Sequence, residues 1–168
     1  MISNKIILFY GLKYLIEKNI KNKYVYKFNR LDLMNPSQIS FNISESNDGL
    51  LDRSLSTGAR YNRIATVKLD CLGSDSSALS LSLLDSDIEI IRDTVNSTFG
   101  YKLYVKVINP IECEISETQD DGFNIELMIV LGSSITNGIF LGYTLEKEYP
   151  RETINFNIEY YVGGNSNE

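Results

Sequence analysis

The sequence contains no histidine and no tryptophan among its 168 residues, and only two cysteines and three prolines. The lack of histidine excludes histidine metal sites and nearly all Ser-His-Asp or Cys-His nucleophile arrangements. Two cysteines cannot supply a four-thiolate zinc site. Phosphate-loop and dinucleotide-binding motifs are also absent. These absences predict a protein that is not an enzyme and that holds no cofactor or metal.

Long hydrophobic runs are missing as well. No stretch of about 18 apolar residues occurs, so we expect no membrane-spanning segment and no membrane partner. The apolar stretch Ile6 to Tyr10 is too short for a signal peptide, and no small-residue cleavage site follows it. We therefore expect mature sequence in a cytoplasmic compartment, with Cys71 and Cys113 as reduced thiols.

The length and composition fit one globular domain over residues 1–168. Hydrophobic residues make up 43% of the chain, and a chain of this size can bury a sizeable core without disulfides or metals. The content of 11 glycines and three prolines is too low for a collagen-like or Pro/Gly-rich disordered chain.

Charge is divided unevenly along the chain. Residues 1–30 hold seven basic side chains and one acidic side chain, so their net charge is +6. The remaining residues hold 9 basic and 21 acidic side chains, a net charge of -12. Such asymmetry indicates either a partner for one end or lysines that solvate the outer face of a first helix. The acidic remainder argues against a domain that binds nucleic acid over its whole surface.

Helical periodicity occurs in two segments, about 4–21 and about 75–96. The first segment repeats apolar residues at helical spacing, with Ser3 or Asn4 as its cap. The second segment carries Leu81, Leu84, Ile88, Ile91 and Val95 along one face, and Ser74 or Asp75 is its expected cap.

Most of the other segments alternate polar and apolar residues, as strands do. The sequence therefore predicts an α+β fold in which a mostly antiparallel sheet packs against the two helices. The expected strands cover residues 24–28, 39–43, 61–72, 103–107, 111–115, 123–131 and 154–162.

Two irregular segments, about 45–60 and about 132–142, interrupt this pattern. Both are rich in turn-forming residues, and long loops within a compact domain are commonly functional. Each also contains apolar side chains, which we expect to dock on a partner. These candidate interface residues are Leu50, Leu51, Leu55, Ile135, Ile139 and Phe140.

Carboxylates form the only clusters with catalytic or metal-binding potential. Glu112 and Glu114 share a strand face about 7 Å apart, a separation close to that of a glycosidase pair, but the face is expected to be exposed and no cleft is indicated. Asp120 and Asp121 lie in a predicted turn without the spacing of a calcium loop. Structural roles are favoured for all four acids.

Arginine and tyrosine meet in the segment Arg60-Tyr61-Asn62-Arg63, before the central predicted strand. Arginine and tyrosine are enriched at interface hot spots, so Arg60, Tyr61 and Arg63 are candidate anchors for a partner. The alternative is a strand entry in which the arginines pair with nearby acids such as Asp48 or Asp52.

This segment opens a stretch that resembles a known family. Residues 60–73 fit the pattern Arg-x-x-Arg-x-x-x-Val-x-Leu ending at Gly73, and the predicted helix to Asn96 follows. The pattern and the layout are similar to the small tail-terminator and tail-completion proteins of tailed bacteriophages. These are often called minor capsid proteins in phages of Gram-positive hosts. The closing stretch 155–162 also resembles the last strand of that family.

The resemblance implies a structural virion protein of the tail or neck, assembled in the host cytoplasm. It implies a ring, hexameric in that family, that terminates the tail tube and faces the neck. The implied partners are further copies of the chain, the tail tube protein, the neck or connector proteins and, in a contractile tail, the sheath. DNA would pass through only as cargo, and the composition suits a low-GC host.

Two other functions remain open from the sequence: a head-tail connector or stopper of the same neck, and a soluble β-rich binding module. The stretch before Arg60 is longer than in the family pattern, so the resemblance assigns no role to residues 31–59.

Overall fold

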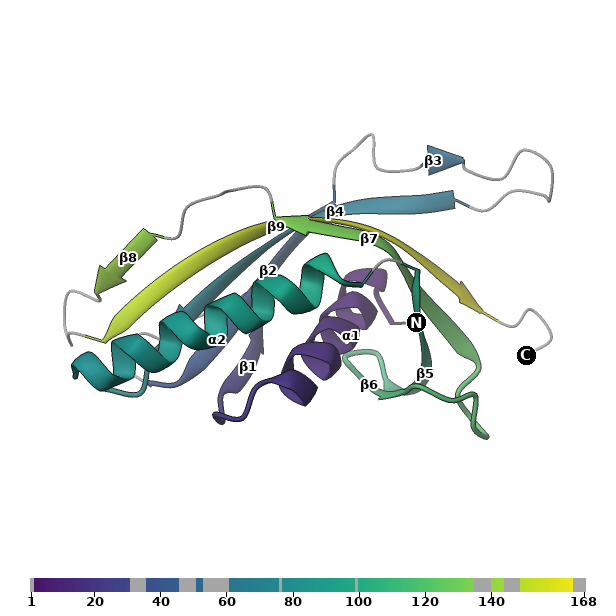
Figure 1. Ribbon diagram of the computed structural model, residues 1–168. Helices are drawn as coiled ribbons and strands as arrows, with labels where there is room; N and C mark the ends of the chain where they lie inside the picture. The colour runs from purple at the N-terminus through teal and green to yellow at the C-terminus, as the bar shows by residue number, and fades with distance from the viewer. Residues whose placement is uncertain are drawn as a thin grey trace.

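The chain folds into one curved sheet with two helices on its concave side (Figure 1). The computed structural model describes residues 2–30, 36–45, 51–52, 61–75, 77–98, 100–134, 140–143 and 149–164. For residues 51–52, 61–62, 131–134, 140–143 and 164 it describes the backbone alone. The predicted α+β class is confirmed.

Seven strands follow one another across the sheet in the order β1-β2-β4-β9-β7-β5-β6, while β3 pairs with β4 and β8 pairs with β9. Every described pair is antiparallel except β1 with β2, which is parallel. The strands are β1 (Val25–Phe28), β2 (Gln38–Glu45), β3 (Leu51–Asp52), β4 (Tyr61–Leu72), β5 (Tyr101–Asn109), β6 (Glu112–Ser116), β7 (Ile125–Ser134), β8 (Phe140–Tyr143) and β9 (Pro150–Gly164).

Helix α1 (Asn4–Asn19) lies inside the curve of the sheet. The Ser3 hydroxyl caps it by accepting a hydrogen bond from the Lys5 amide at 3.2 Å. The helical spacing predicted one apolar face for this segment. The buried surface of α1 is wider than that face, because α1 contacts strands as well as α2. The helix ends at Asn19 and not at residue 21, since Ile20 is extended. Its buried residues are Ile7, Leu8, Phe9, Gly11, Leu12, Leu15 and Ile16.

Gly11 marks the closest approach of α1 to the sheet. A Cβ atom at this position would lie 2.3 Å from the Cδ2 atom of Leu127 in β7, a side chain that is itself fully buried. Glycine lowers the intrinsic stability of a helix by about 1 kcal/mol relative to alanine. At this position glycine allows the backbone of α1 to pack directly against β7, where a larger residue would collide with Leu127.

Helix α2 (Ala78–Asn96) packs on β7 and β9. Leu84, Ile88, Ile91 and Val95 are buried as predicted. The predicted cap is wrong: Ser77 is the capping residue, and its hydroxyl accepts a hydrogen bond from the Ser80 amide at 3.1 Å.

The residues predicted as caps hold the turn before the helix. The Ser74 and Asp75 amides donate to the Ser80 hydroxyl, and the Asp75 carboxylate accepts from the Ser77 amide. The helix therefore starts three residues later than predicted, because Ser74 and Asp75 belong to a turn that is hydrogen-bonded to Ser80.

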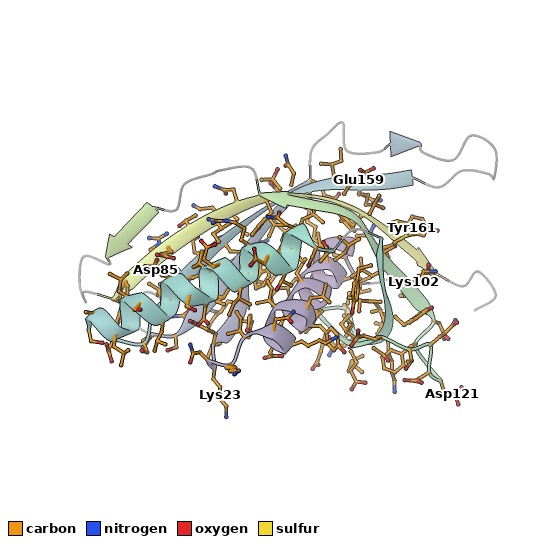
Figure 2. All side chains as sticks on the ribbon, in the orientation of Figure 1. Lys23, Asp85, Lys102, Asp121, Glu159 and Tyr161 are labelled. Carbon is orange, nitrogen blue, oxygen red and sulfur yellow. The ribbon has the colours of Figure 1, made fainter. Side chains whose placement is uncertain are left out.

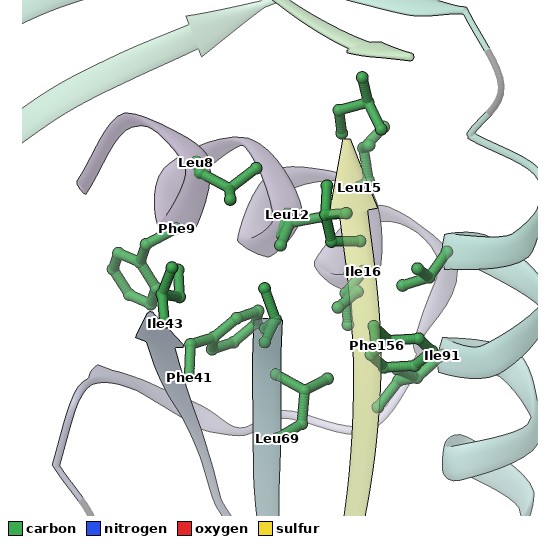
Figure 3. Close-up of a cluster of buried hydrophobic side chains, with 14 of the residues drawn as sticks. Leu8, Phe9, Leu12, Leu15, Ile16, Phe41, Ile43, Leu69, Ile91 and Phe156 are labelled. Carbon is green, nitrogen blue, oxygen red and sulfur yellow. The ribbon is translucent and has the colours of Figure 1, made fainter. Parts of the chain in front are cut away.

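The core fills the space between the concave face and the helices (Figure 3). Strand alternation places every second residue of β4 and β9 against the helices, and Val67 lies opposite Phe156 across this central pair. The Phe9 ring of α1 makes an edge contact with Phe41 of β2, with centroids 5.2 Å apart. The residues of this central pair that belong to the hydrophobic core are Ala65, Val67, Leu69, Cys71, Ile154, Phe156, Ile158 and Tyr160.

The predicted irregular segments are partly strand. Within 45–60, residues 51–52 form β3, which pairs with the first two residues of β4. Within 132–142, β7 continues to Ser134 and residues 140–143 form β8 on β9. The sequence pattern stops at Leu131 because the last residues of β7 are Gly132, Ser133 and Ser134, which are types common in turns. A register shift lies just before them, between Ile129 and Leu131. Neither helix of the described chain has the length and apolar character needed to cross a membrane.

Candidate functional site

The proposed interface residues fall partly outside the described chain. Tyr61, Leu51 and Phe140 lie in β4, β3 and β8, where the backbone is described. Arg63 is described with its side chain. The remaining ones, Arg60, Leu50, Leu55, Ile135 and Ile139, lie outside the described residues.

Arg63 pairs with an acid that sequence reasoning did not select. Its Nη1 atom lies 3.1 Å from the Glu45 carboxylate at the end of β2, and its side chain stays 36% exposed. The hydroxyl of the buried Tyr160 donates a hydrogen bond to the same carboxylate. Burial, followed by this contact with Glu45, raises the pKa of Tyr160. The Glu45 carboxylate therefore joins β2 to both β4 and β9, while the Arg63 side chain remains partly accessible to a partner.

The backbone around Arg63 forms the start of a projecting arm. Pairing of β4 with β9 begins at Arg63, and residues 61 and 62 continue past it to pair with β3. Figure 1 shows β3 and the start of β4 extending away from the helices. The motif that sequence analysis singled out therefore lies where the sheet leaves the body of the molecule.

An open groove of about 400 Å³ separates α1 from β6. Lys13 stands on its helix side, with its Nζ atom 5.7 Å from the Tyr10 ring and 5.8 Å from the Tyr26 ring. Glu112 and Glu114 are exposed on the strand side, as predicted. The lining residues are Tyr10, Lys13, Tyr14, Glu17, Glu112, Cys113, Glu114, Ile115 and Phe123.

The groove offers charged and aromatic side chains to a partner, but the thiol in it has little chemical reactivity. The Cys113 thiol is buried, and burial raises its pKa to about 12. The thiol therefore keeps its proton at neutral pH and is a poor nucleophile. Within the described ranges no three acids or cysteines converge closely enough to hold a metal ion.

Glu117, just after β6, connects the sheet to α1. Its carboxylate accepts hydrogen bonds from Lys18 and Tyr14, each at 2.8 Å, and from Tyr101. The Lys18 contact, followed by those of Tyr101 and Tyr14, lowers the Glu117 pKa to about 2. This exposed cluster holds β6 against the second half of α1.

Two buried acids are satisfied by neighbours from distant segments. Asp87 of α2 accepts hydrogen bonds from Asn22 at 2.9 Å and from Tyr24, which ties α2 to the chain before β1. Asp70 of β4 accepts from Arg151 at 3.1 Å and Thr153 at 2.8 Å on the neighbouring strand. Asp87 lies three residues after Leu84 and four before Ile91, on the apolar face of α2. An acid at such a position is the sequence signal for a buried polar contact, and it was not among the predicted site residues.

A third buried acid, Glu152, is left without such partners. Its side chain is fully buried on the concave face opposite Cys71, and neither carboxyl oxygen accepts a hydrogen bond. Burial, followed by the nearby Asp85 carboxyl, raises the Glu152 pKa to about 8. The sequence signal for this burial is that Glu152 shares a strand face with Ile154 and Phe156, because residues two apart on a strand point to the same side. Because solvent does not reach this carboxyl, we assign it no role with a substrate.

The two ends of the sheet carry opposite charge. The chain around β1 is basic and the chain around β6 is acidic. These outer strands and the arm at Arg63 are the interaction surfaces that the described residues offer. Compared with models of known protein families and with the sequences of curated proteins, the chain matches none of them.

Proposed function

We propose that this chain is a structural subunit of a phage tail or phage-tail-like particle. It forms a ring that ends the tail tube and joins the tube to the neck. The observation that carries the proposal is the order of elements around residues 60–73. Helix α1 and three strands precede β4, β4 ends directly before Gly73, α2 follows, and antiparallel strands complete the chain. This order is the one that the resemblance to tail-terminator proteins implies.

The surface features support an assembling subunit. The convex side of the sheet carries neither of the described helices (Figure 1). Its central strands present polar side chains there, namely Thr66, Lys68, Asn155 and Asn157. Two apolar side chains at the start of α2 are also outward: Leu79 is 69% exposed and Leu83 is 42% exposed. Because Leu79 and Leu83 are four residues apart on one helix, they lie side by side, and we assign this small apolar patch to a contact between subunits.

The proposed mechanism is steric and needs no chemical step. One face of the ring matches the end of the tail tube, and the other face matches the neck, so addition of further tube subunits stops. Contacts between unlike surfaces of identical subunits close into a ring when the rotation between neighbours divides a full turn. The arm formed by β3 and the start of β4 is the part that we assign to the tube or the neck.

The deciding experiment is electron microscopy of particles from a producing strain that lacks this gene. We expect headless tails of irregular and often excessive length. Complementation with the intact gene is the control, and it should restore tails of uniform length with heads attached. Tails of normal length beside full, unattached heads would refute termination and assign the protein to the connector or stopper position.

Intact, infectious particles from the deletion strain would discard the phage proposal altogether. The open groove between α1 and β6 would then make a binding module the leading candidate. Its three aromatic rings, from Tyr10, Tyr14 and Phe123, are the type of surface that such a module needs.

A further inference from the structure

The two outermost strands of the sheet belong to chain segments of equal and opposite charge. Residues 18–30 contain five basic side chains and no acid, whereas residues 107–125 contain five acidic side chains and no base. The first segment includes β1 and the second includes β6, and these strands are the two ends of the strand order. The basic residues are Lys18, Lys21, Lys23, Lys27 and Arg30; the acidic residues are Glu112, Glu114, Glu117, Asp120 and Asp121.

Only one pair of these charges is neutralised between the two segments within the molecule. Lys18 and Glu117 form an ion pair of 2.8 Å. The four remaining bases form no ion pair with any acid in the described part of the chain. Figure 2 shows Lys23 and Asp121 pointing away from the body of the molecule at two separate places. Lys21, Lys23, Lys27 and Arg30 therefore carry charges that no described acid neutralises. On the acidic side, Glu112 accepts a hydrogen bond from Asn109, Asp120 accepts from Ser116 and Thr118, and Glu114 lies opposite Lys106 of β5.

On the side of β1 that faces away from β2, no strand of the described chain pairs with its backbone. The Val25 amide donates to Ser37 at 2.8 Å and the Asn29 amide donates to Phe41 at 2.7 Å, both toward the β2 side. Amides alternate in direction along a strand, so the intervening Tyr26 and Phe28 amides face away from β2. An edge of this kind is a template for pairing with another strand.

The edge of β6 has room for such a strand. Four consecutive residues of β6, from 112 to 115, line the groove against α1. Because successive side chains of a strand point to opposite faces, a groove that contacts all four runs along the edge of the strand. On the helix side, Glu17 adds a further acid to this groove and Lys13 adds a base, so acids outnumber bases in it by three to one.

Exposed apolar side chains occur at both edges. Val25 of β1 is 55% exposed, while Ile108 and Ile111 at the turn into β6 are 47% and 72% exposed. Charged and apolar groups therefore accompany both free edges. This composition suits a contact in which strand pairing, ion pairs and apolar burial act together.

We infer that β1 of one copy adds to β6 of a second copy, so that the basic edge of each subunit meets the acidic edge of its neighbour. The inference rests on the proposed function, because it names the contact by which the ring is built. Pairing of β1 with β1, or of β6 with β6, would oppose charges of the same sign and is disfavoured. The charge pattern therefore selects the contact between unlike edges, the type that propagates around a ring.

The test uses the full chain and two charge-reversed variants, Lys23→Glu/Lys27→Glu and Glu112→Lys/Glu114→Lys. Mass photometry and sedimentation velocity measure assembly. Circular dichroism and thermal unfolding confirm that each variant folds. The matched control is Ser82→Lys/Ser86→Lys/Asp93→Lys, which changes the charge by +4 at exposed positions of α2. This change equals that of the acidic-edge variant but leaves both edges intact.

We expect the unaltered chain and the control to form the same oligomer. We expect each edge variant alone to remain monomeric, with a dissociation constant raised at least about tenfold. An equimolar mixture of the two edge variants should assemble again. In that mixture the acidic β1 of one variant meets the basic β6 of the other, and the remaining two edges match as well. Restored particles should hold equal numbers of the two variants.

Three outcomes overturn the inference. The first is that the unaltered chain stays monomeric at every concentration and at 50 mM salt, which would mean that the lysines prevent strand pairing at this edge. The second is that the oligomer persists in both edge variants. The third is that the mixture fails to assemble although each variant is folded. If the oligomer persists in both edge variants but the deletion strain makes overlong tails, the edge contact is refuted and the proposed function stands. If the mixed edge variants assemble but the deletion strain makes normal tails, the edge contact stands and the proposed function is refuted.

Discussion

Replacing Glu152 by glutamine should stabilise the protein, and the gain should grow with pH. The Glu152 carboxyl is fully buried without a hydrogen-bond partner, and its pKa is raised from 4.5 to about 8. A raised carboxyl pKa means that the folded state holds a proton that the unfolded state has released. The contribution of Glu152 to stability is therefore most favourable below pH 4.5 and is lost as the pH rises toward 8.

The size of this effect follows from the shift. Each pKa unit corresponds to about 1.4 kcal/mol, so at pH 7 the carboxyl lowers the free energy of unfolding by about 3 kcal/mol. Glutamine has nearly the same shape and no charge to desolvate. We therefore expect Glu152→Gln and the unaltered chain to have equal stability near pH 4. At pH 7 the variant should be about 3 kcal/mol more stable.

Urea denaturation followed by circular dichroism between pH 4 and pH 8 measures this difference. Asp121→Asn is the control, because Asp121 is exposed in the turn before β7 and its replacement should change the stability little at any pH. Asp85→Asn should give a smaller gain than Glu152→Gln, since burial contributes more than Asp85 to the raised pKa. The reasoning is refuted if the effect of Glu152→Gln does not vary with pH or if the variant is less stable at pH 7.

Three other predictions concern the helices and the thiols. Ser77→Ala removes the cap of α2 and should lower the free energy of unfolding by about 1 kcal/mol in urea denaturation; an unchanged midpoint would show that the incoming loop suffices. Gly11→Ala should destabilise by about 1–3 kcal/mol despite the better helix propensity of alanine, because the new Cβ meets Leu127, and a higher melting temperature would contradict this. Cys71 and Cys113 are both buried with raised pKa values, so a maleimide should modify them only after denaturation; rapid labelling of the folded chain, read by mass spectrometry, would disprove the packing described here.

Local patterns predicted most elements because their periodicity follows directly from one buried face. The stripe of Leu84, Ile88, Ile91 and Val95 on α2 and the alternation from Ile154 to Val162 on β9 required no knowledge of neighbours. Prediction was less successful where an element has more than one neighbour. Helix α1 contacts strands as well as α2, so its apolar positions exceed one stripe.

The candidate sites were likewise predictable where they depend on one segment, and not where they depend on how distant segments pack together. The sequence selected Arg63 as an anchor, but it could not select Glu45 as the partner, because that pairing depends on how β2 and β4 align. The exposure of Glu112 and Glu114 was predictable from alternation. The groove beside them was not, since α1 forms its other wall.

Composition and spacing within single segments were enough to predict the fold class, both helices, the exposed carboxylates and the segregation of basic and acidic residues. The positions of β1 and β6 at the two ends of the sheet, which put the basic and acidic segments at opposite edges, became known only from the folded chain. Strand order depends on contacts between residues far apart in the chain. The distribution of charge was readable from the sequence, and its arrangement for pairing between copies emerged only with the order of the strands.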